Sequence, residues 1–473
     1  MSPDTATAHR PLDSASFAER GGAARPHRAR IVHLGLGNFH RAHQAWYTAH
    51  AADAADWGIA SFTGRSPLQA EQLRRQDGLY CLVTRGESGD TVEVVGSIVE
   101  VQDASRLDRL MELLSDPAVA IVTLTITEAG YRLTDSGTPD TSDPVVVADI
   151  AELSRVFAAP PSDAAEGATV NGSLSRLLLG LDARRRVDAG PIAIVPCDNV
   201  PNNGEFVRRG LLGLAQAASS ELATWIGQHV SFVSTSVDRI TPRIDGPVPA
   251  VEAAGWIDVS PVVTEPFADW VLSGDFPAGR PAWETAGARF VDDLEPWENR
   301  KLWLLNGAHS ILAFAGLTRG LETVAAAIDD PRCRALVTDF WAETVTHLPE
   351  GIEHVKYRRD LLDRFRNPRI EHRLAQIASD ATTKVRYRFV AVAERTVAEG
   401  ADPSASARAV ASWMVALRAG VVPADGAAGD LSRALDADDP VRAMLELVSP
   451  ALAMDERFPV LVASALYALQ ATD

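Results

Sequence analysis

The chain has 473 residues, of which 46% are hydrophobic and 23% charged, and its formal net charge at pH 7 is −18. This balance is typical of a soluble globular protein with more than one domain. The negative charge disfavours a nucleic acid or an anionic membrane as a partner. The three cysteines lie far apart in the sequence, which fits a reducing cytoplasm. No apolar run reaches the roughly 18 residues of a membrane span, so no membrane partner is expected.

Residues 1–28 are polar, rich in alanine and arginine, and lack the apolar segment of a signal peptide. They predict a disordered tail. The following segment, RIVHLGLGNFHRAH at 30–43, predicts a strand, a glycine turn and a helix, which is the start of a dinucleotide-binding domain. The cofactor contacts expected in this turn are Gly35, Leu36, Gly37, Asn38 and Phe39.

In that turn, Gly35 permits the tight bend and Gly37 lets the backbone approach a pyrophosphate. His40 stands where the usual pattern has its third glycine. His40 and His43 could be read as metal ligands, but no cluster of Cys, Asp or Glu accompanies them. No metal site is therefore predicted.

Residues 57–63 predict the second strand. Enzymes that use NAD usually carry an acid after this strand, which binds the ribose hydroxyls. Here Gly64, Arg65 and Ser66 follow instead. Arg65 could hold the 2′-phosphate of NADP or stack on adenine, so NAD is expected and NADP stays open.

The next segments continue an α/β pattern. Residues 91–101 alternate like an exposed strand, whereas 118–126 and 191–199 read as buried parallel strands and 230–233 as a short strand. Open α/β sheets bind ligands beyond such strand ends. Thr127 and Glu128 follow the first buried run and are expected to contact the cofactor, and Asn199 ends the second.

From Leu294 onward almost every segment has a helical period, broken at prolines. Residues 261–291 carry few regular signals and are expected to lead to the domain boundary. The expected architecture is an N-terminal α/β Rossmann-like dinucleotide-binding domain over residues 29–294, followed by an all-α substrate and catalytic domain over residues 295–473.

The segment ENRKLWLLNGAHS at 298–310 opens the helical region. Lys301, Asn306 and His309 are spaced i, i+5 and i+8, which on an α-helix places them within an arc of about 140°. An ammonium, an amide and an imidazole on one face suit chemistry at a carbon–oxygen bond. The alternative is an amphipathic helix whose polar side chains merely face solvent. A site between the two domains would bring this face together with Asn199.

Eight segments in order resemble the polyol-specific long-chain dehydrogenases, a family that includes mannitol 2-dehydrogenase, arabinitol dehydrogenase and fructuronate reductase. They are GLGNFHRAHQ at 35–44, QDGLY at 76–80, TITEAGY at 125–131, PCDNVPNNG at 196–204, VDRITP at 237–242, EPFADWV at 265–271, GRPAWETAGARFVDD at 279–293 and KLWLLNGAHS at 301–310. The resemblance runs over nearly the whole chain after residue 30. It implies metal-independent hydride transfer between a nicotinamide cofactor and a secondary alcohol of a sugar alcohol or sugar acid.

The resemblance also implies roles for single residues. Lys301 matches the general base, Asn199 and Asn306 the oxyanion-stabilising asparagines, His309 the substrate-binding histidine and Asp238 an acid near the site. Arg373 and Lys384 are implied as further substrate contacts, although Asp380 is followed here by Ala-Thr-Thr where the family more often has Gly-Ser. A monomer is expected rather than an obligate oligomer.

Other enzyme classes, other branches of this family and a non-catalytic protein are alternatives to this function. A zinc alcohol dehydrogenase needs ligand groups that are absent, and a short-chain dehydrogenase needs a Tyr-x-x-x-Lys pair that is also absent. Within the family, LNGAHS and HRLAQIA are somewhat nearer to fructuronate reductase than to mannitol 2-dehydrogenase. A sugar-phosphate enzyme of the mannitol-1-phosphate 5-dehydrogenase type is less expected, because that branch is usually shorter. A non-catalytic NAD-binding regulator would be expected to lose Lys301 or one of the asparagines.

Overall fold

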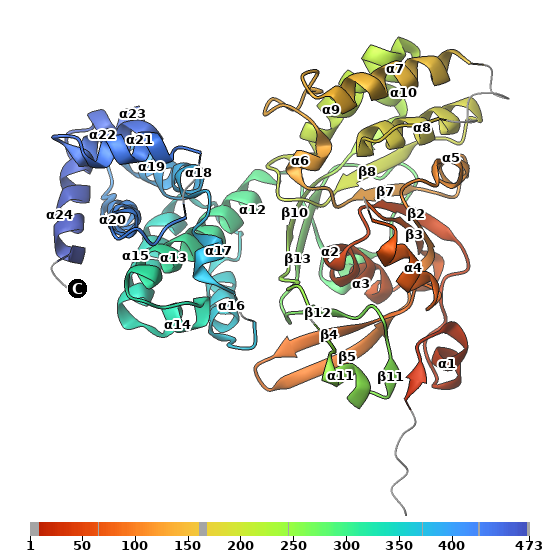
Figure 1. The fold of residues 1–473 in the computed structure, drawn as a ribbon, viewed down its shortest axis with the longest axis horizontal. Helices are drawn as coiled ribbons and strands as arrows, with labels where there is room; N and C mark the ends of the chain where they lie inside the picture. The colour runs from red at the N-terminus through yellow and green to blue at the C-terminus, as the bar shows by residue number, and fades with distance from the viewer. Residues whose placement is uncertain are drawn as a thin grey trace, which may run out of the picture. The chain divides into compact units, whose positions relative to one another are not determined.

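The fold was taken from a computed structural model, which describes residues 9–64, 66–159, 168–244, 246–370, 372–423 and 426–470. The chain divides into two compact units, Met1–Leu294 and Glu295–Asp473. In the described residues every strand belongs to the first unit, and the second is helical (Figure 1). No helix of the described ranges combines the length and the hydrophobicity needed to cross a membrane.

A six-stranded parallel sheet organises the N-terminal unit. Its strand order is β6-β3-β2-β7-β8-β9, with bounds Ile98–Gln102, Gly58–Phe62, Ala29–Leu34, Ile121–Leu124, Ile192–Pro196 and Val230–Phe232. The chain thus starts in the middle of the sheet, builds one half outward, and then returns to build the other half. This order defines the doubly wound dinucleotide-binding fold, whose ligand site lies at the switch point between β2 and β7. The predicted fold class is confirmed.

Hydrophobic side chains on both faces of the sheet are buried under helices. One face is covered by α5 (Leu107–Leu114), α7 (Pro144–Ala158), α8 (Ser173–Arg186), α9 (Asn203–Ala218) and α10 (Ser220–His229). The other is covered by α2 (Asn38–Ala42), α3 (Gln44–His50) and α4 (Leu68–Arg74). Because both faces are buried, the central strands read as continuous apolar runs, as their sequences predicted.

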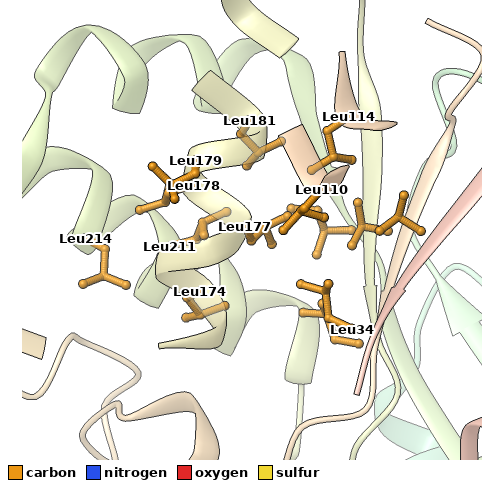
Figure 2. Close-up of a cluster of buried hydrophobic side chains, with 14 of the residues drawn as sticks. Leu34, Leu110, Leu114, Leu174, Leu177, Leu178, Leu179, Leu181, Leu211 and Leu214 are labelled. Atoms are coloured by element: carbon orange, nitrogen blue, oxygen red, sulfur yellow. The ribbon is translucent and has the colours of Figure 1, made fainter. Parts of the chain in front are cut away.

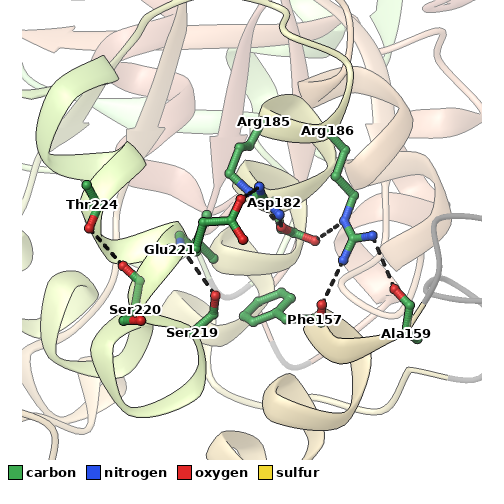
Figure 3. Close-up of polar contacts among 10 residues, drawn as sticks. Phe157, Ala159, Asp182, Arg185, Arg186, Ser219, Ser220, Glu221 and Thr224 are labelled. Atoms are coloured by element: carbon green, nitrogen blue, oxygen red, sulfur yellow. Dashed lines mark hydrogen bonds and ion pairs between the residues drawn. The ribbon is translucent and has the colours of Figure 1, made fainter.

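Helix α8 is enclosed along its length. Figure 2 shows its leucines between those of α5 and α9, with Leu34 of β2 nearby; the α8 leucines are Leu174, Leu177, Leu178, Leu179 and Leu181. At its C-terminal end, Asp182 accepts hydrogen bonds from Arg185 and Arg186, and Arg186 also donates to the main-chain oxygen of Phe157 at 3.1 Å (Figure 3). The helix is therefore fixed by packing on its sides and by polar contacts at its end.

Two three-stranded sheets extend the unit. They have the orders β12-β4-β5 and β10-β13-β14, with bounds Val262–Thr264, Tyr80–Gly86, Gly89–Val95, Ser234–Asp238, Asp269–Ser273 and Arg289–Phe290. The single strand predicted over 91–101 is wrong. The chain turns at Gly96, so that β5 pairs with β4 while β6 joins the main sheet. Residues 261–291 contain three strands of two to five residues, too short to show a period.

The predicted disordered tail is wrong for residues 9–28. Strand β1 (Arg10–Pro11) pairs with β11 (Trp256–Ile257), and α1 (Ser14–Glu19) follows. Leu12 is only 1% exposed and joins a small apolar cluster. Arg25 donates hydrogen bonds to the main-chain oxygens of Gly96 and Ile98. One apolar anchor and one arginine thus order a polar segment, which composition alone does not reveal. Residues 1–8 lie outside the described residues.

The C-terminal unit is a helical array, as predicted. Its longer α-helices are α13 (Ala308–Thr318), α15 (Pro331–Thr344), α16 (His354–Arg366), α20 (Ser404–Arg418) and α24 (Phe458–Gln470). Two segments are π-helices, η3 (Lys301–Gly307) and η5 (Arg386–Val390). The other helices of this unit are α12 (Glu295–Arg300), α14 (Val324–Asp329), η4 (Val345–His347), α17 (Leu374–Ile377), α18 (Ala381–Val385), α19 (Ala391–Ala398), α21 (Ala428–Leu435), α22 (Pro440–Val448) and α23 (Pro450–Met454).

Candidate active site

A cleft of about 1200 Å³ opens at the carboxyl ends of the main-sheet strands. Its walls are formed by the glycine turn after β2, the loops after β3, β6 and β7, and the start of α8. Its polar lining residues include Thr63, Asp103, Ser105, Thr127, Arg132, Asn171 and Arg176. The cleft lies at the switch point of the sheet, where this class of fold binds dinucleotides.

The glycine turn fits a dinucleotide. Gly35 has φ +114°, and a Cβ there would lie 2.3 Å from the main-chain oxygen of Thr125. No other residue type is therefore accommodated. A Cβ on Gly37 would meet only the oxygen of Gly35, at 3.7 Å, so that side of the turn is open for a phosphate to approach. Gly35 and Leu36 line the cleft, whereas Gly37, Asn38 and Phe39 do not.

His40, at the third position of the glycine pattern, packs beneath the turn. Its ring stacks on that of His33 at 3.4 Å, and its Nε2 lies 3.0 Å from the hydroxyl of Ser61. Burial lowers the pKa of His33 to about 3 and that of His40 well below its ordinary value. These histidines are thus neutral packing groups under the turn. Across the described ranges, no three His, Cys, Asp or Glu side chains form a group that could hold a metal ion.

The loop after β3 forms one end of the cleft. Thr63 and Gly64 line it, while Arg65 lies outside the described residues. Asp103, which follows β6, accepts hydrogen bonds from the main-chain N–H and hydroxyl of Ser105. Arg176 of α8 reaches this end, with Nη1 3.4 Å from the main-chain oxygen of Gly64. Asp103 and Arg176 were not anticipated, because neither belongs to a motif.

The ends of β7 and β8 are joined by a buried polar pair. The hydroxyl of Tyr131, in α6 (Glu128–Tyr131), donates to the Oδ2 of Asp198, whose Oδ1 accepts from the main-chain N–H of Val200. Burial raises the pKa of both side chains. The loop that carries Asn199 is therefore held by hydrogen bonds to both carboxylate oxygens of Asp198.

The other residues predicted near these strand ends have different environments. Thr127 lines the cleft and starts α6, but Glu128 does not line it. Asn199 is exposed and follows β8. Asp238 is buried at the end of β10, where it pairs with Asp269 of β13 in the strand register.

Lys301, Asn306 and His309 lie in one continuous helical segment of the C-terminal unit. Lys301 and Asn306 are half-buried on η3, and His309 is buried on α13. The α-helix expected here is locally a π-helix. Its hydrogen bonds join residues five apart, so Lys301 and Asn306 lie about one turn from each other. The wider turn brings the ammonium and the amide closer to one face than an α-helix would.

Side chains from other helices hold the π-helix. Arg388 of η5 donates from Nη1 to the main-chain oxygen of Asn306 at 3.0 Å and to the hydroxyl of Ser310 at 2.8 Å. Trp341 donates to the oxygen of Leu304 at 2.7 Å. A Cβ on Gly307 would meet the ring of Phe340 at 2.8 Å, so the segment packs closely there. Burial lowers the pKa of Arg388 to about 10.

His309 packs against two other rings in the helical unit. Its ring meets those of Phe365 and His372 at 4.8 and 4.9 Å. Burial lowers the pKa of His309 well below its ordinary value, and His372, Arg364 and Arg388 lower it further. His309 is therefore neutral and suited to hydrogen bonding rather than to carrying charge.

The two further substrate contacts predicted from the resemblance lie differently. Arg373 is exposed and forms an ion pair with Glu322 at 3.3 Å, whereas its neighbour His372 packs on His309. Lys384 donates to the main-chain oxygens of Ile377 and Ser379. Burial and the charge of Arg388 lower the pKa of Lys384. The structure thus brings His372 and Arg388 to this region, and neither was anticipated.

The doubly wound sheet, its glycine turn and the helical unit define a two-domain dinucleotide-dependent oxidoreductase. Residues 29–285 match the mannitol dehydrogenase Rossmann domain, and residues 293–444 match the mannitol dehydrogenase C-terminal domain. The chain belongs to the mannitol dehydrogenase family.

Individual relatives agree with this assignment. The chain is 35% identical to D-mannonate oxidoreductase of Escherichia coli (strain K12) over 401 residues, which cover 82% of this chain and 79% of the relative. A crystal structure of D-sorbitol dehydrogenase in substrate-free form superposes with a TM-score of 0.86 and 28% identity, covering 98% of this chain and 99% of that one. Mannitol 2-dehydrogenase of Pseudomonas fluorescens was solved as a ternary complex with NAD and D-mannitol. It superposes with a TM-score of 0.76 and 30% identity, covering 98% of this chain and 97% of that one.

Proposed function

We propose that this protein transfers a hydride, without a metal, between a nicotinamide cofactor and a secondary alcohol of a sugar alcohol or sugar acid. The observation that carries the proposal is the π-helix that places Lys301 and Asn306 on one face, followed by the buried His309. A nicotinamide cofactor accepts or returns the hydride when it is bound. NAD is the expected cofactor, and its support is the glycine turn and the complex of the Pseudomonas fluorescens relative with NAD.

The side chains of this chain would handle the proton and the charge. Lys301 takes the proton from the substrate hydroxyl during oxidation and returns it during reduction. The amide of Asn306 stabilises the negative charge that develops on the same oxygen, and Asn199 is proposed to do the same. His309, being neutral, orients the substrate through a hydrogen bond. Three further contacts near the substrate remain predictions, namely Asp238, Arg373 and Lys384.

The surroundings of His309 favour a sugar acid over an uncharged sugar alcohol. Two guanidinium groups, those of Arg364 and Arg388, act on His309 and disfavour its protonation. His372 has a lowered pKa of its own and adds no positive charge at neutral pH. A positive region of this kind stabilises a carboxylate.

A steady-state screen tests the proposal. Mannitol, arabinitol, mannonate and mannitol 1-phosphate are each offered with NAD and with NADP. We expect turnover with at least one of the first three, and the highest kcat/KM with mannonate. Turnover with mannitol 1-phosphate alone would contradict the proposed substrate class, and nucleotide binding without turnover of any of the four would favour a regulator.

We further propose that residues 29–294 and 295–473 are the functional domains. We also propose that one chain is the active unit and that the protein works in the cytoplasm. Both family domains are contained in this chain. All three cysteines, Cys81, Cys197 and Cys333, are buried free thiols, as a reducing compartment favours. Light scattering after size exclusion should give the mass of one chain. A dimer that loses its activity when it dissociates would contradict a single chain as the active unit.

A further inference from the structure

Arg176 reaches the end of the cofactor cleft where the adenosine ribose is expected. In a doubly wound fold the ribose lies beyond the second strand, which is β3 in this chain. Gly64 follows β3 and lines the cleft, and the Nη1 of Arg176 lies 3.4 Å from its main-chain oxygen. The guanidinium is thus placed at the position that decides between a ribose hydroxyl and a ribose phosphate.

The hydrogen-bonding capacity of Arg176 is largely unused. Its Nε is buried and has no hydrogen-bond partner, and within the described part of the chain its side chain forms no ion pair. Burial lowers its pKa, although the charges of Asp149 and Asp103 oppose this. A buried N–H without a partner, such as this Nε, is costly unless a ligand meets it.

The two nearby carboxylates are occupied by main-chain donors. Asp149 accepts from the N–H groups of Asn171 and Gly172, at 2.9 and 2.7 Å, and so fixes the start of α8. Asp103 accepts from the N–H and hydroxyl of Ser105 at 2.7 and 2.6 Å. Among the described residues, neither carboxylate forms an ion pair with Arg176, whose side chain lines the cleft.

Helix α8 holds Arg176 in place. Its leucines are buried between α5 and α9 (Figure 2), and its C-terminal end is fixed by Asp182, Arg185 and Arg186 (Figure 3). The guanidinium is therefore presented by a rigid element rather than by a loop. Recognition by such a group loses less conformational entropy on binding.

From these observations we infer that Arg176 recognises the 2′-phosphate of NADP, so that this chain binds NADP as well as NAD. The inference rests on the proposed function, because it assumes that the cleft holds a nicotinamide dinucleotide. An arginine pairs with a phosphate through charge-assisted, often bidentate hydrogen bonds. The residues described after β3, Thr63, Gly64 and Ser66, carry no carboxylate. The carboxylate that does line this end, Asp103, already accepts from the N–H and the hydroxyl of Ser105.

Two nucleotide fragments that differ by one phosphate test this directly. Calorimetry measures the Kd of adenosine 2′,5′-bisphosphate and of adenosine 5′-monophosphate for the full-length enzyme and for Arg176→Met. We expect the variant to lose about tenfold or more in affinity for the bisphosphate, and less than twofold for the monophosphate. Arg176→Lys should retain part of the difference, since it keeps the charge but not the planar fork.

Arg132→Met is the matched control. Arg132 also lines the cleft but is paired with Asp143. If only general positive charge matters, this variant should weaken the bisphosphate as much as Arg176→Met does, which would contradict the inference. Equal losses of both fragments in Arg176→Met and Arg176→Lys would also contradict it, while leaving the proposed function standing. A wild-type protein that binds neither fragment would contradict the proposed function and the inference with it.

Discussion

Arg388 donates a hydrogen bond to the main-chain oxygen of Asn306, with 3.0 Å between Nη1 and the oxygen. The same nitrogen also serves the hydroxyl of Ser310. A π-helix leaves main-chain groups without their α-helical partners, and an arginine from a second π-helix supplies one of them here. The position of the Asn306 amide therefore depends on Arg388.

Arg388→Met should lower the turnover by about tenfold to hundredfold, because it displaces the Asn306 amide, which is proposed to stabilise the developing charge. The free energy of unfolding should fall by about 1–3 kcal/mol, since two acceptors lose their donor. The Kd for NAD should be unchanged. Steady-state kinetics, urea unfolding and calorimetry measure the three quantities. The control is Arg433→Met, which removes an exposed arginine paired with Asp430. A turnover equal to that of the control would contradict the positioning role.

Gly35→Ala should abolish tight binding of the cofactor. A Cβ at this position would lie 2.3 Å from the main-chain oxygen of Thr125, on a residue with φ +114°. We expect the Kd for NAD, measured by calorimetry, to rise by at least about tenfold, together with a loss of stability of about 1–3 kcal/mol. Gly227→Ala, on α10 with open space around it, is the control and should be neutral or slightly stabilising. Unchanged affinity in Gly35→Ala would contradict the role assigned to the glycine turn.

Buried neutral histidines should make the protein less stable in acid. The pKa of His33 falls from an ordinary 6.5 to about 3 on folding because of burial. Above pH 6.5 both the folded and the unfolded forms are neutral, and the full stability is present. As the pH falls below 6.5 only the unfolded form gains a proton, so stability is lost. At pH 5 this one group should account for a loss of about 2 kcal/mol relative to pH 7.

His33→Gln tests that dependence, because the amide can still meet Thr123 and Thr125 without titrating. Urea unfolding at pH 7 and pH 5 should show a smaller difference in the free energy of unfolding for this variant than for the wild type. His27→Gln changes an exposed histidine and should leave the difference as it is. If His33→Gln keeps the full difference, other groups are responsible.

The sequence was most informative where a pattern is local. The glycine turn after a buried strand, the buried parallel strands ending at Leu124 and Pro196, and the helical period after Leu294 all predicted the structure, because each depends on neighbouring residues. The π-helix was not predictable, because the spacing of Lys301 and Asn306 is compatible with either helix. Its form depends on contacts with Trp341 and Arg388, which are distant in sequence.

The role of Arg176 was not predictable from the sequence for a similar reason. It is an ordinary arginine on a leucine-rich helix, more than one hundred residues after Gly64. Only the sheet order and the packing of α8 bring the two together. The order of the segment around Arg10 and Leu12 was not predictable either, because one buried leucine among polar residues leaves no periodic signal.

Removal of metals should leave the enzyme active. Prolonged incubation with a chelator followed by desalting should not change the turnover, since the proposed chemistry uses Lys301 and the asparagines alone. A zinc alcohol dehydrogenase treated in parallel should lose its activity. A loss in this enzyme that added zinc restores would contradict the proposed metal independence.

The most direct test of the account is the turnover of Lys301→Ala in alcohol oxidation. If Lys301 is the general base, as proposed, it should contribute about 10²- to 10⁴-fold to the rate. The Kd for NAD should stay the same, and added small amines should restore part of the rate. Lys356→Ala, which removes an exposed lysine paired with Asp360, is the control and should keep full activity. A folded Lys301→Ala enzyme that turns over its best substrate at the rate of this control would contradict the mechanism.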